Sequence, residues 1–177
     1  MFLLRFFVNE QERRQSVRCA YDYRCGYCGV REEETGSKLE IDHFQSRSAG
    51  GSDDLDNLVY CCPTCNRLKG DFWLLGNLPV THARLLHPKR DDLSAHLRED
   101  VEGRLVALTE TGTFHIERLR LNRPPLIALR RSRQQRATLW QELKLAQEEQ
   151  AQLQERIASL ERSLEETRAQ LARLLNR

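Results

Sequence analysis

The sequence predicts an α+β fold: a small ββα domain clamped by cysteines, a β-rich extension and a long C-terminal coiled-coil helix. One observation is a pair of Cys-x-x-Cys motifs, at residues 25–28 and 62–65, that enclose two short apolar segments. Another is the change in composition after Pro125, where glycine and proline disappear and apolar residues recur every three or four positions. The regions expected are residues 1–75, with the clamped core at about 19–70, then 76–124 and 125–177.

The composition indicates a folded protein whose charge is nearly balanced. Of its 177 residues, 31% are charged and 40% are hydrophobic, which excludes a disordered chain. The formal net charge is +2, so any basic surface must be local. The apolar start from Met1 to Val8 is too short for a signal peptide, and we expect a core strand there. No apolar run reaches the length of a membrane span, so we expect a cytoplasmic protein.

Local signals predict the elements of the core in order. The first strand is expected where apolar and polar residues alternate, and the loop after it is rich in Ser, Gly and Asp. Pro63 suits the first turn of a helix, and Gly70 lies where that helix would end. The expected elements are a helix over 9–20, strands over 39–43 and 58–61, a loop over 45–57 and a helix over 63–70.

The extension carries weaker signals. Four consecutive apolar residues, Phe72 to Leu75, are expected in the core. Residues 104–109 and 112–116 read as two strands around Thr111-Gly112, which predicts a β-hairpin. Pro124-Pro125 marks the boundary with the long helix.

The C-terminal region has an unbroken heptad pattern, which predicts a left-handed coiled coil. A helix from residue 126 to the end would be roughly 80 Å long at 1.5 Å per residue and cannot bury its apolar seam alone. We therefore expect a homodimer or homo-oligomer through residues 136–177, with chain number and direction left open. The a positions are Arg136, Leu143, Gln150, Ile157, Leu164 and Leu171, and the d positions are Leu139, Ala146, Leu153, Leu160, Thr167 and Leu174.

The two Cys-x-x-Cys pairs have the spacing of a structural zinc site. Four thiolates satisfy tetrahedral zinc and leave no open position for chemistry. Disulfides in a secreted protein are the alternative, and the lack of a signal peptide disfavours them. Cys19 and Cys61 remain, and we expect both to be small buried side chains. The expected zinc ligands are Cys25, Cys28, Cys62 and Cys65.

An Asp-His dipeptide, Asp42-His43, lies between the cysteine pairs. Hydrolysis of a phosphodiester needs a hard cation and a base for water. Asp42 offers a hard oxygen for Mg²⁺ or Mn²⁺, and the imidazole of His43 titrates near neutral pH. Neighbours on a strand point to opposite faces, so the strand must end or twist here for both to serve one site. By itself such a pair is more often an ordinary surface feature.

Residues 25–70 resemble the HNH endonucleases, which have a zinc-bound ββα-metal fold. The shared pattern is Cys-x-x-Cys, Asp-His, a Gly-rich loop, Asn-Leu, a second Cys-x-x-Cys followed by His or Asn, and a lysine. The match spans about a quarter of the chain. The matching positions are Cys25, Cys28, Asp42, His43, Gly50, Gly51, Asn57, Leu58, Cys62, Cys65, Asn66 and Lys69.

The resemblance implies a metal-dependent DNA endonuclease. His43 would be the general base that activates water, and Asn57 would brace the loop and orient His43. Asp42 and Asn66 would hold the catalytic divalent metal. Asn66 replaces the histidine of the family name, and its amide oxygen favours Mg²⁺ or Mn²⁺ over a late transition metal. Ser46 stands where relatives often have proline, which is not a ligand.

A basic stretch around the start of the long helix is suited to contacts with the DNA backbone, where affinity comes from phosphates regardless of sequence. A solvated helix face is the simpler interpretation of the same charges. We expect the partner to be double-stranded DNA. The residues expected to contact it are Lys69, Arg123, Arg130, Arg131 and Arg133.

Two other functions remain open from the sequence. A non-catalytic zinc-containing DNA-binding protein would use the basic stretch and the heptads in the manner of a basic-region zipper. That stretch is short, and a pure binder has no need for Asp42-His43 beside Asn66. The chain also suits a nuclease subunit of a larger assembly, such as an antiphage system, docked through its coiled coil.

Overall fold

The structure is a computed structural model that describes residues 10–73 and 84–175. Contacts divide the chain into two compact units, Met1–Arg131 and Ser132–Arg177. The first unit contains both the predicted core and the predicted extension. The strand predicted over residues 1–8 lies outside the described residues, as do Leu74 and Leu75.

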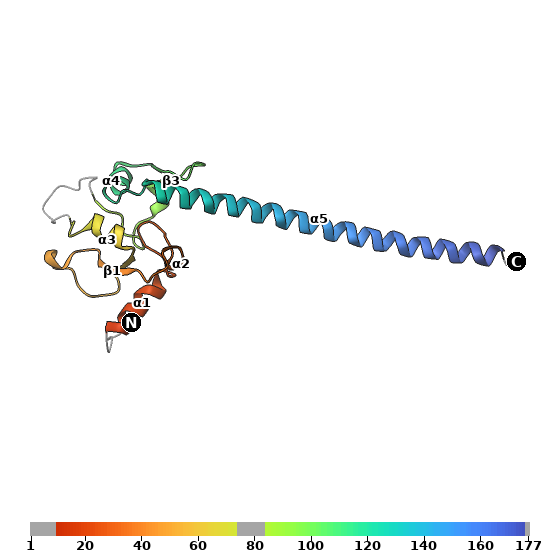
Figure 1. The fold of residues 1–177 in the computed structure, drawn as a ribbon, viewed down its shortest axis with the longest axis horizontal. Coiled ribbons are helices and arrows are strands. Elements are labelled where there is room, and N and C mark those ends of the chain that lie inside the picture. The colour runs from red at the N-terminus through yellow and green to blue at the C-terminus, as the bar shows by residue number, and fades with distance from the viewer. Residues whose placement is uncertain (1–9, 74–83, 176–177) are drawn as a thin grey trace. The chain divides into compact units, whose positions relative to one another are not determined.

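The described elements confirm the α+β fold class, with two small sheets and a long C-terminal helix (Figure 1). In chain order they are α1 (Glu10–Ala20), α2 (Glu32–Thr35), β1 (Glu40–His43), the 3-10 helix η1 (Arg47–Ala49), β2 (Leu58–Cys61), α3 (Pro63–Lys69), the 3-10 helix η2 (Leu93–Ala95), β3 (Leu97–Glu99), β4 (Leu105–Ala107), α4 (Glu110–Arg118) and α5 (Pro124–Leu175).

The core of the first unit is an antiparallel pair of strands covered by two helices. β1 pairs with β2 so that Asp42 lies opposite Val59 and His43 opposite Leu58. α3 packs against β1, and α1 packs against β2. All four residues of β2 are buried, which explains why its sequence is uniformly apolar rather than alternating. Both strands and both helices of the core were predicted within one or two residues of their ends.

Cysteine, proline and glycine set the ends of α3. Cys62 is the N-cap, and its sulfur accepts a hydrogen bond from the backbone N–H of Cys65 at 3.4 Å. Pro63 follows, where its missing N–H costs no hydrogen bond. The helix ends at Gly70, whose φ of 54° is strained for any residue with a Cβ. The short helix thereby presents two zinc-ligand candidates in its first turn.

The hairpin predicted around Thr111-Gly112 is wrong. β4 pairs instead with the preceding β3, and residues Glu110–Arg118 form α4. Thr109 is the N-cap of α4, accepting a hydrogen bond from the N–H of Gly112 at 3.1 Å. A Cβ on Gly112 would lie 2.2 Å from the carbonyl oxygen of His96. The glycine therefore permits close packing of a helix, and it is not a turn residue.

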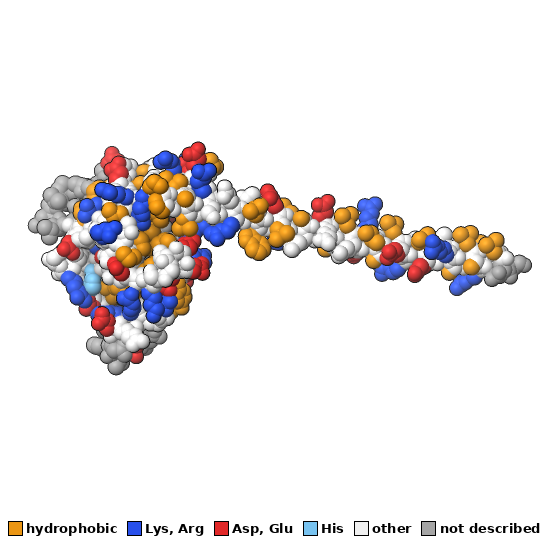
Figure 2. Space-filling view, viewed as in Figure 1, with side chains coloured by type: hydrophobic (Ala, Val, Ile, Leu, Met, Phe, Trp, Pro, Cys, Tyr) orange, Lys and Arg blue, Asp and Glu red, His pale blue; other side chains and the backbone are white. Residues whose placement is uncertain are grey.

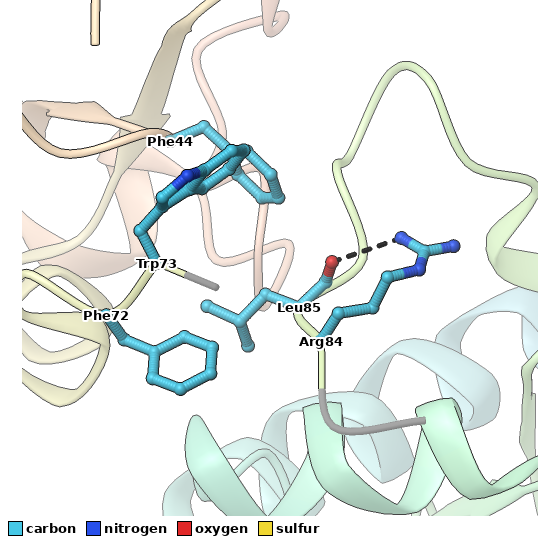
Figure 3. A pocket seen from close by; sticks show the side chains of 5 residues that line it. All are labelled: Phe44, Phe72, Trp73, Arg84 and Leu85. Carbon is cyan, nitrogen blue, oxygen red and sulfur yellow. Dashed lines mark hydrogen bonds between the residues drawn. The ribbon is translucent and has the colours of Figure 1, made fainter. Parts of the chain in front are cut away.

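Aromatic packing holds the chain just after His43. The ring of Phe44 meets Trp73 edge-on at 5.8 Å between centroids and His87 at 4.6 Å. Phe44 and Trp73 line a small, mostly apolar cavity of about 170 Å³ together with Phe72, Arg84 and Leu85, and Figure 3 shows the aromatic side chains facing Leu85. The end of β1 is thus tied to the core, which restricts the movement of its last residue.

The long predicted helix is confirmed as α5, of 52 residues. Its apolar seam is exposed in the single chain: Leu160, for example, is 63% exposed, and orange side chains recur along the helix in Figure 2. Pairing of this seam with another chain stays a prediction. Among the described residues, no helix is long and apolar enough to cross a membrane.

Candidate active site

The two Cys-x-x-Cys pairs meet in space, as a structural zinc site requires. Their four sulfurs lie within 4.8 Å of one another, and the Sγ atoms of Cys28 and Cys62 are 3.8 Å apart. Tetrahedral zinc with bonds of about 2.3 Å holds its sulfur ligands about 3.8 Å apart. Three of the cysteines are buried and one is half-buried, so the site has no open position for substrate. We call the set Cys25, Cys28, Cys62 and Cys65 the zinc clamp.

The two remaining cysteines differ in environment. Cys61 is fully buried in β2, as expected. The expectation for Cys19 is wrong, because its side chain is exposed at the end of α1. Cys19 lies one turn from Gln15, whose amide contacts its sulfur at 3.2 Å.

Arg123 lies against the zinc clamp. Its Nη2 atom is 3.9 Å from the sulfurs of Cys28 and Cys62 and 3.7 Å from that of Cys65. Four thiolates around Zn²⁺ leave a net charge of −2, which a guanidinium offsets. The prediction that Arg123 contacts nucleic acid is therefore not supported by its position.

Two side-chain pairs connect β1 to α3. Glu40 and Asp42 lie on one face of the strand, and Asn66 and Lys69 lie one turn apart on the helix. Asn66 Nδ2 donates to Glu40 Oε2 at 2.8 Å, and Lys69 Nζ donates to Asp42 Oδ1 at 3.1 Å. This juxtaposition brings Asn66 directly to Glu40, a residue that the sequence argument did not include.

Asp42 and Lys69 form a buried ion pair. Lys69 is 0% exposed, and its Nζ also donates to the carbonyl of His43 at 2.7 Å. The phenol of Tyr27 donates to Asp42 Oδ2 at 2.6 Å. Burial raises the pKa of Asp42, and Lys69 and Tyr27 oppose that shift. The prediction that Lys69 contacts nucleic acid is wrong, since its charge is enclosed and already paired.

His43 points to the loop that follows β1. Its Nε2 is 2.6 Å from Oδ1 of Asp53, and Arg47 Nη2 donates to the same oxygen at 2.8 Å. Hydrogen bonds from His43 and Arg47 lower the pKa of Asp53 to about 2. The carboxylate is therefore ionised near neutral pH and can only accept hydrogen bonds, while Arg47 Nε also lies 3.2 Å from Nε2 of His43.

Asn57 braces the loop between β1 and β2. Its Oδ1 accepts from the N–H of Gln45 at 2.8 Å, and its Nδ2 donates to the carbonyls of Gln45 and Ser52. Gly51 lies against this network, where a Cβ would be 1.9 Å from the Gln45 carbonyl oxygen. The described partners of the His43 ring are Asp53 and Arg47, so the orienting of His43 by Asn57 stays a prediction.

His43, Glu40 and Asn66 line one open cleft of about 580 Å³. α1 contributes Arg13 and Arg14 to its wall, and Glu10 and Arg47 complete the charged lining. The cleft thus combines hard oxygen atoms, an imidazole and guanidinium groups. That set is suited to a divalent cation and an anionic substrate.

The three basic residues predicted on α5 are placed differently from one another. Arg130 is 6% exposed, and its guanidinium donates to the carbonyls of Gly103 at 2.6 Å and Leu121 at 2.8 Å. Its predicted contact with nucleic acid is wrong, because the group holds the extension to the helix. Arg131 is exposed and Arg133 is half-exposed, so both stay candidates.

Sequence reasoning missed six charged residues of the cleft and its border: Glu10, Arg13, Arg14, Glu40, Arg47 and Asp53. A signal for Glu40 did exist in the sequence. Glu40 lies two residues before Asp42 on the same face of a strand, and Asn66 lies three residues before Lys69 on the same face of a helix. When Asp42 meets Lys69, Glu40 therefore meets Asn66. No local pattern links Arg13 on α1 to Asp53, forty residues later.

Comparison with known proteins finds a family that resembles the core of the first unit. Residues 25–72 match the family model of the HNH endonucleases. Comparison with curated proteins and with solved structures gives no significant match. The matched segment begins at the first cysteine of the zinc clamp and includes β1, β2 and α3. Residues 25–72 of this chain are therefore similar to the HNH endonucleases, and the extension and the long helix α5 follow this segment in the sequence.

Proposed function

We propose that the protein is a metal-dependent DNA endonuclease that hydrolyses phosphodiester bonds. The observation that supports this most is the shared cleft of His43, Glu40 and Asn66 within an HNH domain. These groups supply a base and hard oxygen ligands within reach of solvent. The role of the zinc clamp is structural, because four cysteine ligands leave no open coordination position on the metal.

In the proposed reaction His43 takes the proton from a water molecule as its oxygen attacks phosphorus. The phosphorus–O3′ bond breaks, the phosphate stays on the 5′ side, and the leaving 3′ oxygen takes a proton from solvent water to become a hydroxyl. A divalent cation, when bound, supplies stabilisation of negative charge on the phosphate and the leaving oxygen. Asn57 keeps the loop after His43 in place through its three backbone hydrogen bonds.

Asp42 and Asn66 are the proposed metal ligands, and Glu40 is a third oxygen donor beside them. Asn66 and Glu40 are bonded at 2.8 Å in the open cleft. Asp42 is engaged by Lys69 and Tyr27, although a carboxylate has further lone pairs to offer. The charge of Lys69 weakens Asp42 as a ligand, so we expect Glu40 to contribute measurably to metal affinity.

Supercoiled plasmid tests this proposal. Wild-type protein should convert it to nicked or linear forms with Mg²⁺ or Mn²⁺, and EDTA should stop the conversion. Glu40→Gln should raise the metal concentration for half-maximal cleavage by about tenfold or more, because one anionic oxygen is lost. Asp42→Asn should do likewise and also lower stability by about 3 kcal/mol, since it leaves Lys69 buried without its counter-charge.

Glu33→Gln is the matched control for the loss of one glutamate charge. Glu33 is exposed and pairs with Arg31 outside the cleft. The Glu33→Gln protein should therefore need the same metal concentration for half-maximal cleavage as wild type. Cleavage that survives EDTA would contradict the metal-dependent reaction. A protein that shifts duplex DNA on a gel without cutting it in either metal would support the binding-protein alternative.

We also propose that α5 joins two copies in a coiled coil, with the direction of the two chains left open. Arg156 at g and Glu161 at the following e position can pair between parallel chains in register. Two nuclease domains in one dimer would suit cleavage of both DNA strands. Docking onto another protein, as in a larger antiphage assembly, would use the same seam.

Zinc thiolates and free cysteines suit the reducing cytoplasm.

Leu153→Glu with Leu160→Glu should convert the dimer to a monomer at micromolar concentration. Each buried leucine contributes about 2 kcal/mol, so four leucines per dimer should change the dissociation constant by more than about a thousandfold. Light scattering after gel filtration measures the mass. Ala151→Glu with Ala158→Glu adds the same charges at b positions and should remain dimeric. A wild-type protein that is monomeric under these conditions would refute the homodimer.

A further inference from the structure

A carboxylate of the chain itself occupies an anion-binding site in the cleft. Asp53 accepts from Nη1 of Arg13 at 3.0 Å, from Nη2 of Arg47 at 2.8 Å and from Nε2 of His43 at 2.6 Å. The donors come from α1, η1 and the end of β1. We call Arg13, His43 and Arg47 the anion site.

The anion site is open to solvent on its occupied side. The side chains of Asp53 and Arg47 are 47% and 64% exposed, whereas those of Arg13 and His43 are mostly covered. Arg13 and His43 are therefore held by the fold, and both Arg47 and the occupant lie on the exposed loop between β1 and β2. A ligand entering the cleft can reach the donors if Asp53 moves away.

The present occupant also blocks the proposed base. Nε2 of His43 is already engaged with the Asp53 carboxylate at 2.6 Å, so that atom is not available to a water molecule. Removing the carboxylate frees this nitrogen. Occupation of the anion site and activation of water at Nε2 are thus mutually exclusive.

We infer that a phosphodiester group of DNA displaces the Asp53 carboxylate and binds to Arg13 and Arg47, leaving His43 free. The inference rests on the proposed function, since it names the residues that hold the substrate there. A phosphodiester carries one negative charge and two unesterified oxygens, as a carboxylate does, and accepts from guanidinium groups in the same geometry. Replacing one anion by another leaves the charge of the cleft unchanged, so the carboxylates of Glu10 and Glu40 do not oppose the exchange by a new repulsion.

Equilibrium binding in EDTA tests the site without any cleavage. Fluorescence anisotropy of a labelled duplex gives the dissociation constant and its dependence on salt. Arg13→Gln and Arg47→Gln should each weaken binding about five- to tenfold and reduce the slope of log affinity against log salt by about one. Arg98→Gln removes the same charge from β3 outside the cleft and should leave both quantities close to wild type.

Asp53→Asn should tighten binding about fivefold or more, because the internal competitor is lost. Asp54→Asn is its matched control, since Asp54 lies next in the same loop and bonds to Ser52 instead. The gain from Asp53→Asn should disappear when Arg13 and Arg47 are both replaced by glutamine. That non-additivity separates displacement from a general change in charge.

The outcomes are decisive in both directions. If Asp53→Asn binds no more tightly than Asp54→Asn, or if the arginine variants keep the wild-type salt slope, the inference is overturned and Asp53 is a fixed partner of His43. Should Asp53→Asn unfold, the two arginine variants still test the site in a chain that keeps Asp53. A wild-type protein that binds DNA through these residues but cuts no plasmid would refute the proposed catalysis and leave the anion site standing.

Discussion

Replacement of His43 by alanine is expected to lower the rate of plasmid cleavage by about 100- to 10,000-fold, the usual contribution of a general base. His43 is the imidazole that lines the cleft with Glu40 and Asn66. Its backbone carbonyl, which accepts from Lys69, is kept by the substitution. We therefore expect the fold and the zinc content to change little.

The measurement is a time course of nicked and linear plasmid at saturating Mg²⁺ or Mn²⁺. His96→Ala is the matched control, because His96 lies in the extension and bonds to Thr109 away from the cleft. It should cut at the wild-type rate. Cleavage by folded His43→Ala at a rate within a few-fold of wild type would remove His43 as the base and leave the mechanism without its central residue.

Loss of the zinc clamp is expected to have the largest effect on stability. Cys65 is fully buried and its sulfur is one of four that lie within 4.8 Å of one another. Structural zinc contributes on the order of 10 kcal/mol to folding in small zinc domains, which is comparable to the whole stability of a domain. Cys65→Ser should therefore abolish zinc binding and the cooperative unfolding of the first unit.

Zinc content per chain and near-ultraviolet circular dichroism, which reports on packed aromatic residues such as Phe44 and Trp73, give the two readouts. Far-ultraviolet signal is less informative, since the helix α5 contributes to it independently of the clamp. Cys19→Ser is the matched control, because Cys19 is exposed and outside the clamp. A Cys65→Ser protein that holds no zinc and melts at the wild-type temperature would contradict the structural role.

Elements with strong local signals were predicted correctly. The two Cys-x-x-Cys pairs, Pro63 and Gly70 specify α3 and its ends, because cap geometry depends on a few adjacent residues. The absence of glycine and proline after Pro125 similarly predicts α5. The hairpin at Thr111-Gly112 failed because a glycine that permits close packing has the same local appearance as a glycine in a turn.

The functional site depended on contacts far apart in the chain. Lys69 and Arg130 are basic residues at plausible surface positions in the sequence, yet the fold buries both and pairs them with Asp42 and with backbone carbonyls. Burial of a charge depends on the partners that surround it, and those partners come from other elements.

The sequence by itself determined the zinc clamp, the ββα core, the long helix and His43 as the leading candidate for the base, since spacing and residue chemistry are local properties. Only the tertiary structure decided that Asn66 meets Glu40, that Lys69 neutralises Asp42, and that Asp53 occupies a site built by Arg13 and Arg47. The physical reason is that pairing and exposure of charged groups follow from the packing of α1, β1, η1 and α3 against one another, which no single segment encodes.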